Sequence, residues 1–378
     1  MIFDVVVIGA STAGLYAAEL LALSGKKVGL FDRNDKKPDF RTYIITPGFK
    51  RTVPDFDSTL IRHETNIIHI QAGLEFRTIN LSTPDLTIER GQLIDNFMSR
   101  AKMAGVEIYQ NSKFVSFDHE NNKTKLRIII GDTEKIIQTK YLIGADGVHS
   151  QVRELAGMAA VPKVPLLQAE IELPEGWNPG MTKVWFDVND SPYFYWLIPD
   201  RDNKAVVGLI SDPGADIRYL LDSFLKKNSF LPLAYQSGQA GMYIPKTKIE
   251  STSGGVKILL VGDAAGQVKV TTVGGTVTGF AGAQAASKAI LEKKPYQVTL
   301  RKVNRELRIH YFIRSLLDKM TNQDYSVLLR GLSPRVQSFL NRYDRDQMRQ
   351  NFWKLALIQP RYIFLGLKLL LRIAIIGV

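Results

Sequence analysis

The sequence predicts an α/β protein with a Rossmann-like nucleotide-binding domain, an inserted antiparallel β-sheet domain and a helical C-terminal region. Three observations predict this fold. The chain opens with a buried-strand pattern, a glycine-rich turn and a helix; two later strands end in glycine and aspartate turns; and short strand patterns lie between those two. A chain of 378 residues with 45% hydrophobic residues is long enough for about two domains.

The first βαβ unit starts with a strand over 3–8, a continuous apolar run typical of a parallel strand buried on both faces. A turn over 9–14, with sequence GASTAG, leads into a helix. A second strand over 27–31 ends at Asp32, which is placed to accept hydrogen bonds from an adenosine ribose. This order is typical of a unit that binds a dinucleotide.

The small residues of the glycine-rich turn have separate expected roles. Gly9 allows the tight turn, and Gly14 allows the helix to pack against the strand. The free N–H groups at the start of the helix, beside Ala13, would face a pyrophosphate. Ser11 stands where the fingerprint has its middle glycine, so its side chain is expected to narrow the approach of the phosphate.

Two later motifs have a similar form. Residues 140–153 contain a strand, a Gly-Asp-Gly turn around Asp146 and the start of a helix. Residues 257–266 contain a buried strand that runs into Gly262 and Asp263. Taken alone, each is compatible with an ordinary turn.

Together, the three motifs resemble those of the flavoproteins of the para-hydroxybenzoate hydroxylase type, over a region from Ile2 to about Leu291. In that family the first motif binds the ADP pyrophosphate, the second lies near both cofactor and substrate, and the third holds the ribitol chain. The resemblance implies FAD as the cofactor. The residues implied to bind it are Gly9, Ser11, Ala13, Gly14, Asp32, Arg33, Arg90, Asp146, Gly262, Asp263, Gly274 and Gly275.

Arg90 is included among the expected FAD-binding residues because of a shorter motif. Residues 88–97 look like the family element in which an arginine that precedes a helix contacts the cofactor. A guanidinium there would neutralise pyrophosphate charge. An arginine that opens a helix is also common without any ligand.

Within this superfamily the sequence is most similar to the archaeal geranylgeranyl reductases. Residues 262–275, GDAAGQVKVTTVGG, resemble their GDAAGQVKPTTGGG, and a helix of small residues follows. Val270 replaces the proline, and Val273 replaces the first of three glycines. Branched side chains at these positions are expected to reshape or crowd the flavin pocket. Of a second family element, YxWxFPK, only Trp196 and Pro199 match.

The middle of the chain predicts a substrate domain. Strand patterns over 168–173, 182–187, 193–199 and 204–211 are separated by turn residues, which indicates an antiparallel meander. Aromatic residues concentrate there and would line an apolar pocket over a flavin, although each of them is also compatible with a core position. We expect Tyr195 and Trp196 to be catalytic, with Tyr195 or water as the proton source.

These patterns divide the chain into three parts. The expected FAD-binding domain is discontinuous and comprises residues 1–155 and 250–295. The substrate domain is expected over 156–249, and the helical, basic C-terminal region over 296–378.

The composition restricts the chemistry. Cysteine is absent, so this chain has no disulfides, thiolate metal sites or dithiol relay, and redox chemistry requires a bound cofactor. The five histidines are scattered without metal-ligand spacing, so no metal site is expected. No basic leader precedes the first apolar run, which predicts a cytoplasmic protein.

The net charge of +12 is concentrated near the C-terminus. Residues 301–378 contain fifteen basic and five acidic residues, a net charge of +10. Residues 361–378 are apolar except for Arg361, Lys368 and Arg372, which share one helical face. This pattern predicts a helix that lies on the inner surface of a membrane, and packing on the protein itself is the alternative. No motif for nucleic acid accompanies the charge.

The resemblance to the geranylgeranyl reductases implies reduction of C=C bonds in an isoprenoid or other apolar lipid by hydride transfer from reduced FAD. The electron donor, NAD(P)H or ferredoxin, is left open. Two alternatives remain: a flavin-dependent monooxygenase that hydroxylates an aromatic or apolar substrate, and a non-catalytic, membrane-associated protein that binds flavin or lipid.

Overall fold

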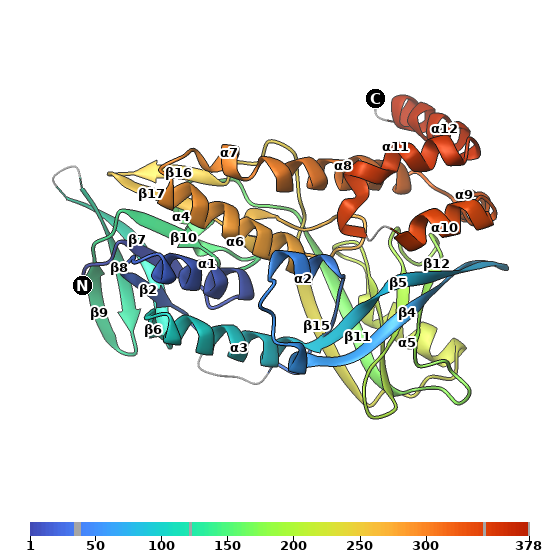
Figure 1. The fold of residues 1–378 in the computed structure, drawn as a ribbon, viewed down its shortest axis with the longest axis horizontal. Coiled ribbons are helices and arrows are strands. Elements are labelled where there is room, and N and C mark those ends of the chain that lie inside the picture. The colour runs from blue at the N-terminus through green and yellow to red at the C-terminus, as the bar shows by residue number, and fades with distance from the viewer. Residues whose placement is uncertain (34–38, 121–122, 343–344, 377–378) are drawn as a thin grey trace.

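The computed structural model describes residues 1–33, 39–120, 123–342 and 345–376. They form a six-stranded sheet, an eight-stranded sheet and a three-stranded sheet, with helices on their faces and a helical region at the C-terminus (Figure 1). The predicted fold class is confirmed.

The six-stranded sheet forms the centre of the Rossmann-like part. Its order is β16-β17-β10-β1-β2-β6, and β17, β10, β1, β2 and β6 run parallel. The strands are β1 (Val5–Ile8), β2 (Val28–Phe31), β6 (Glu107–Tyr109), β10 (Tyr141–Gly144), β16 (Glu250–Ser253) and β17 (Val256–Leu260). All residues of β1 and β2 are buried, as expected for parallel strands covered on both faces.

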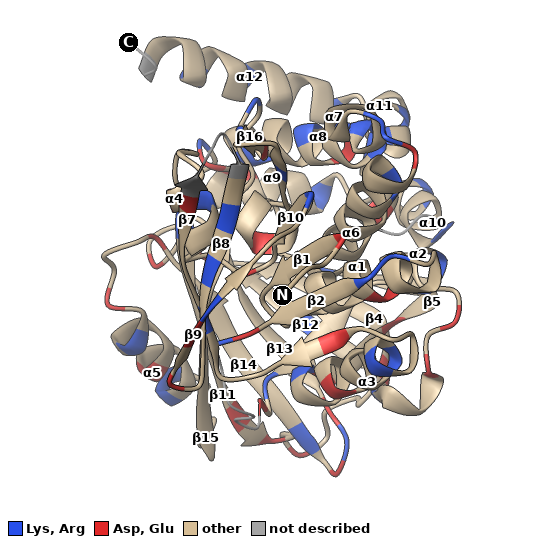
Figure 2. Cartoon of the chain, turned by 90° about the vertical axis from the view of Figure 1, so that its left-hand side faces the viewer, with Lys and Arg blue, Asp and Glu red and all other residues tan. Residues whose placement is uncertain are grey.

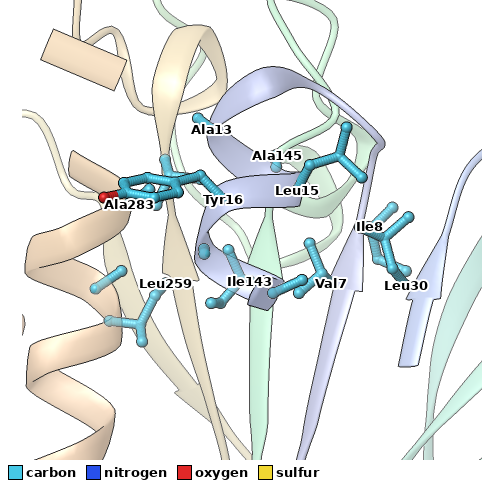
Figure 3. Packing of buried hydrophobic residues seen from close by; sticks show 14 of the residues in the cluster. Val7, Ile8, Ala13, Leu15, Tyr16, Leu30, Ile143, Ala145, Leu259 and Ala283 are labelled. Carbon is cyan, nitrogen blue, oxygen red and sulfur yellow. The ribbon is translucent and has the colours of Figure 1, made fainter. Parts of the chain in front are cut away.

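Helices cover one face of this sheet. Helix α1 (Thr12–Leu23) packs between α3 (Arg90–Met103) and α6 (Thr276–Leu291). In Figure 3, Leu15 of α1 points to the side of Val7 and Ile8, whereas the Tyr16 ring points to Ala283 of α6. The three-stranded sheet, β7 (Ser112–Glu120), β8 (Lys123–Ile130) and β9 (Thr133–Ile137), contributes to the same core.

The eight-stranded sheet has the order β15-β11-β14-β13-β12-β4-β5-β3. Helix α5 (Ile217–Lys227) packs on one face of it. The strands are β3 (Thr42–Ile45), β4 (Ile61–Ala72), β5 (Glu75–Glu89), β11 (Lys163–Glu172), β12 (Met181–Phe186), β13 (Tyr195–Pro199), β14 (Lys204–Ile210) and β15 (Ala234–Gly241).

The extent of this sheet corrects the expected substrate domain. Strands β3, β4 and β5 come from residues 42–89, which the sequence placed in the FAD-binding domain, so the range 156–249 does not contain the whole sheet. Strand β12 pairs with β4 in parallel, so the sheet is mixed and not purely antiparallel. The pairing joins segments more than a hundred residues apart, which a local pattern does not reveal. We propose to assign β3–β5 to the substrate side of the molecule.

The C-terminal region is helical, as predicted. It contains α7 (Tyr296–Thr299), α8 (Arg301–Leu317), α9 (Asn322–Arg330), α10 (Pro334–Arg342), α11 (Met348–Ile358) and α12 (Arg361–Ile376). Residues of α9, α10 and α12 form one apolar cluster with β4, β5 and β12, and Tyr325 stacks on Phe186 with ring centroids 4.4 Å apart. Within the described ranges, no helix is long and apolar enough to cross a bilayer.

Gly14 is expected to be essential for the packing of α1. A Cβ at this position would lie 2.3 Å from the Gly9 carbonyl oxygen and 2.7 Å from the Ala145 Cβ. We expect Gly14→Ala to lower the free energy of unfolding by roughly 2 kcal/mol or more, because the backbone at Gly9 must move to make room for the added methyl group. Urea unfolding measures the change.

Gly366→Ala is the matched control, because Gly366 is also helical and a Cβ there meets nothing within 4 Å. This substitution should stabilise the protein by up to about 1 kcal/mol through helix propensity. Equal effects of the two substitutions would contradict the packing argument.

Candidate active site

The three sequence motifs meet at one edge of the six-stranded sheet. Strands β1, β10 and β17 are parallel, and in their register Ile8 pairs with Gly144, which pairs with Leu260. The turns that follow these residues therefore lie side by side at the carboxyl ends of the strands, where open α/β sheets bind their ligands.

The first and second motifs are in direct contact. Gly9 has φ = +104°, and a Cβ there would lie 2.5 Å from the Ala145 carbonyl oxygen. Because Gly14 also lies against Ala145, both glycines are required by this contact. The tight turn expected at Gly9 and the close packing expected at Gly14 are confirmed.

Ser11 and Asp32 stabilise the first turn. The Ser11 hydroxyl accepts a hydrogen bond from the Gly14 N–H at 3.2 Å and caps α1. Its side chain is thus directed to the helix as well as bordering the cavity described below. Asp32 Oδ2 accepts a 2.6 Å hydrogen bond from the Ala10 N–H. Asp32 and the exposed Arg33 do not line that cavity, so their expected contact with an adenosine ribose remains a prediction.

The Asp146 side chain stabilises the second turn. Its carboxylate accepts hydrogen bonds from the Ser150 hydroxyl and, at 3.0 Å, from the Val152 N–H, so it holds the start of α4 (Gln151–Leu155). Burial raises the pKa of Asp146. Its neighbours Ala145 and Gly147 line the cavity instead. Asp146 thus shapes the turn, and its expected contact with the cofactor remains a prediction.

Arg153 links the second motif to the third and was not identified from the sequence. Its buried guanidinium donates to the carbonyl oxygens of Ala264 at 2.7 Å, Ala159 at 2.6 Å and Lys248 at 3.3 Å. The only sequence signal was its place at the end of the second motif.

The Asp263 carboxylate accepts no hydrogen bond from the described residues. Asp263 lines the cavity. Burial raises the pKa of Asp263 to about 6, although the charges of Arg90 and Arg41 oppose this shift. A Cβ at Gly275 would lie 3.2 Å from Asp263 Oδ1, so the glycine at the start of α6 leaves room for the carboxylate.

Two arginines share one aspartate opposite Asp263. Arg41 Nη2 lies 2.6 Å from Asp39 Oδ2, and Arg90 pairs with the same oxygen. Burial alone would raise the pKa of Asp39, but the hydrogen bonds and charges of Arg41 and Arg90 lower it to about 2. Both arginines line the cavity, so the structure adds Arg41, which the sequence did not identify, to Arg90.

A single cavity of about 900 Å³ connects these motifs with an apolar region. Its volume is near the upper end of the range of roughly 300–1,000 Å³ typical of small-molecule sites. The limb at the sheet edge, here the polar limb, is lined by Ser11, Thr12, Ala13, Arg41, Arg90, Gly147, Gly262, Asp263, Gly274 and Gly275. The apolar limb is lined by Ile68, Ile70, Phe194, Trp196, Ile198, Leu316, Met320, Leu329, Leu365 and Leu369, among others.

Of the two expected catalytic residues, only Trp196 lines the cavity. It is 8% exposed, and its Nε1 donates to Gln168 Oε1 at 3.3 Å. Tyr195 is 1% exposed on the other face of the sheet, where its ring stacks on Phe224 with centroids 4.0 Å apart. Adjacent residues of a strand point to opposite faces, so Tyr195 cannot act with Trp196 at this cavity. This corrects the proposed role of Tyr195.

Val270 and Val273 are buried in the loop that leads to α6. Val273 borders the cavity and has φ = +52°, a left-handed conformation that is rare for a β-branched residue and costs on the order of 1–3 kcal/mol. Glycine in the relatives' motif avoids this strain. Here the valine side chain instead joins an apolar cluster with Trp196.

The polar limb fits FAD. The first turns of α1 and α6 both border it, and a helix N-terminus favours negative charge. Arg41 and Arg90 add positive charge for a pyrophosphate. Asp263 offers an unpaired carboxylate that suits the hydroxyls of a ribityl chain. The residues present therefore match the parts of a flavin dinucleotide.

Known proteins agree with this geometry. A family model described as FAD binding domain matches residues 3–171. The digeranylgeranylglycerophospholipid reductase of Methanocaldococcus jannaschii is 26% identical over 362 residues, which cover 88% of this chain and 90% of that protein. The chain is a relative of the geranylgeranyl reductases and carries an FAD-binding domain.

Further relatives agree with this placement. The geranylgeranyl diphosphate reductase of Rhodobacter capsulatus is 27% identical over 300 residues, which cover 77% of this chain and 75% of that protein. A geranylgeranyl bacteriochlorophyll reductase-like structure from Thermoplasma acidophilum superposes with a TM-score of 0.77 at 19% identity, covering 88% of this chain and 92% of that chain. The latter similarity shows the shared fold.

The ion pairs of Asp39 with Arg41 and Arg90 predict how the stability of the protein depends on pH. The pKa of Asp39 is depressed, so its contribution is fully present above pH 4 and is lost as the pH falls towards 2. We expect Asp39→Asn to lower the free energy of unfolding by roughly 2 kcal/mol at pH 7, and the difference to vanish near pH 2. Denaturant titrations at several pH values measure it.

Asp202→Asn is the control, because Asp202 is exposed and sits in a turn. Its effect should stay within about 0.5 kcal/mol at every pH. A loss for Asp39→Asn that does not depend on pH would show that the carboxylate charge is not responsible.

Proposed function

We propose that this relative of the geranylgeranyl reductases is an FAD-dependent enzyme that reduces C=C bonds of an isoprenoid lipid. One observation carries the proposal: the polar limb that fits FAD opens directly into a long apolar limb within the same cavity. A polyunsaturated hydrocarbon chain in the apolar limb would thus lie next to a redox cofactor. The named relatives act on geranylgeranyl groups, which are chains of this kind.

The residues of the chain have binding and shielding roles in this reaction. Bound FAD, once reduced, would supply a hydride. Arg41 and Arg90 would hold its pyrophosphate, and Asp263 its ribityl chain. Trp196 and the side chains of the C-terminal helices would orient the hydrocarbon and exclude water from it.

Product analysis tests the activity. The protein is loaded with FAD, reduced anaerobically with dithionite and mixed with geranylgeranyl diphosphate in detergent. We expect products heavier by two hydrogen atoms per reduced bond in mass spectra. Oxygen-dependent hydroxylation of an aromatic substrate would instead support the monooxygenase, and binding of FAD without any turnover would support the non-catalytic alternative.

The raised pKa of Asp263 predicts how FAD binding depends on pH. If the ionised carboxylate accepts a hydrogen bond from FAD, binding weakens once the group is protonated, below about pH 6. We expect the Kd for FAD to increase about tenfold between pH 7 and pH 5. Flavin fluorescence measures the Kd.

Asp263→Asn should bind FAD more weakly at pH 7 and lose this dependence. Asp202→Asn should keep it, because Asp202 is remote from the cavity. Equal Kd values for the wild-type protein at pH 5 and pH 7 would exclude Asp263 as the titrating contact.

We also propose that α12 contacts the inner surface of a membrane. The helix packs on the protein itself, which was the alternative to membrane contact: Leu365 and Leu369 are buried in the apolar cluster, and Lys368 (2.7 Å) and Arg372 both pair with the buried Asp324 of α9. In Figure 2, α12 lies at the edge of the molecule and most of its ribbon is coloured as neither basic nor acidic. Its exposed side chains include Phe364, which is 72% exposed, and Leu371, which is 63% exposed. The last two residues of the predicted helix, 377–378, lie outside the described residues.

Two further observations support a membrane as the partner. The region 301–378 carries a net charge of +10, which favours anionic lipids. Helices α11 and α12 also line the apolar limb with residues such as Leu355 and Leu365. A lipid substrate would thus have a short path from a bilayer to the cavity.

Flotation with phosphatidylglycerol vesicles tests this contact. The double variant Phe364→Glu/Leu371→Glu should lose most vesicle binding, because it places two charges on the apolar face. The control Tyr219→Glu/Leu231→Glu changes side chains of similar exposure near α5 and should float like the wild type. Equal flotation of both variants would exclude α12 as the contact.

A further inference from the structure

A buried histidine lies where the loop before α6 meets α8. His310 is 1% exposed, and its Nδ1 is 2.6 Å from the hydroxyl oxygen of Thr271. Its Nε2 is buried without a hydrogen-bond partner among the described residues, and Glu306 Oε1 lies 3.6 Å away, one helical turn earlier. The proposed function leaves these three residues without a role.

This group reaches from the cavity towards the surface. Thr271 and His310 line the cavity, in the loop region between Asp263 and the start of α6. Glu306 is at the other end, and its side chain is 17% exposed. The three side chains therefore connect the cavity interior with the outside of α8.

Saturation of a C=C bond requires such a connection. The bond gains a hydride at one carbon and a proton at the other, and each turnover consumes one proton from a site that excludes water. Tyr195 cannot supply it, because it lies on the other face of the sheet. Tyr325 lines the apolar limb, but it is fully buried and its ring stacks on Phe186.

We propose that Thr271 and His310 form the proton relay for alkene reduction, with Glu306 as its outer end. The inference rests on the proposed function. The Thr271 hydroxyl gives its proton to the substrate carbon and takes one from His310 Nδ1. His310 regains a proton at Nε2 from Glu306 after that carboxylate has taken a proton from solvent, and the ring returns to its Nδ1–H tautomer before the next turnover. The hydride and its electron pair come from reduced FAD, so one C=C bond becomes one C–C bond with two added hydrogens.

The surroundings of His310 favour the neutral form of its imidazole ring. Burial lowers its pKa; Lys269 lowers it further, whereas Glu306 and Asp346 raise it. Lys269 itself is paired with Asp346 at 2.5 Å, and the Glu306 carboxylate accepts from the Arg349 N–H at 3.2 Å. The imidazole is therefore neutral at pH 7 and has one nitrogen free to accept a proton as the other donates.

Reoxidation of the reduced protein by geranylgeranyl diphosphate tests the relay. Thr271→Val and His310→Gln should slow this step roughly a hundredfold or more, which is the usual range for loss of a positioned proton donor. The Kd for FAD and the rate of reduction by dithionite should change by less than about twofold. Thr271→Ser keeps the hydroxyl and should stay close to the wild type, and so should His69→Gln on β4.

The apo protein provides a second readout that needs no substrate. In nitrogen-15 NMR, the His310 ring should titrate below the usual histidine range, and Thr271→Val should change its tautomer balance, whereas His69→Gln should not.

The two readouts separate the possible failures. One outcome is that the wild type fails to reduce the lipid while Thr271→Val still changes the His310 tautomer balance. In that case the proposed function is wrong, and the hydrogen bond between Thr271 and His310 is confirmed. If the wild type is active and Thr271→Val is equally active, the relay is wrong. The relay is also wrong if Thr271→Val leaves the NMR signals of the His310 ring unchanged.

Discussion

The contact between Gly9, Gly14 and Ala145 is the constraint on which the rest of the site depends. It joins the first two strand-end turns so closely that a single methyl group would separate them. Because β1, β10 and β17 are in parallel register, the third turn then falls beside them and brings Asp263 to the same edge. Arg153 ties this turn to the second motif by a hydrogen bond to the Ala264 carbonyl.

A second level of organisation places charge around that edge. Asp39 holds Arg41 and Arg90 in the cavity, so two positive groups lie near the carboxylate of Asp263. The arrangement separates a region of charged and polar groups from an apolar limb that continues under the C-terminal helices. Nucleotide and hydrocarbon chemistry can thus share one cavity without mixing their environments.

The C-terminal helices connect this interior to the surface. Asp324 pairs with two of the three cations of α12, Lys368 and Arg372, which fixes the rotation of the helix about its axis. Leu365 and Leu369 are thereby turned inward, and Phe364 and Leu371 outward. The same helix forms part of the cavity wall and presents an apolar surface, which relates lipid entry to membrane contact in the proposed function.

Local patterns in the sequence determined the parallel strands, the glycine turns, the C-terminal helices and the FAD-binding motifs. Continuous apolar runs and glycines with positive φ depend on their local environment, so the first strand was predicted, over 3–8 where the structure has Val5–Ile8, and the turn at Gly9 was predicted correctly. The tertiary structure decided which distant segments meet. Strand β12 pairs with β4, Arg41 joins Arg90, and His310 meets Thr271 across 39 residues, and none of these contacts has a local signature.

The expected pair Tyr195 and Trp196 shows the same division. Residue type alone predicted a catalytic role for both residues. Because side chains alternate along a strand, Tyr195 points into the apolar cluster under α5 and Trp196 into the cavity. Likewise, the cations of α12 defined one helical face in the sequence, and only the tertiary structure showed that Lys368 and Arg372 on this face pair with the buried Asp324. Sequence periodicity fixes which side chains share a face. The partner across the interface fixes where that face points.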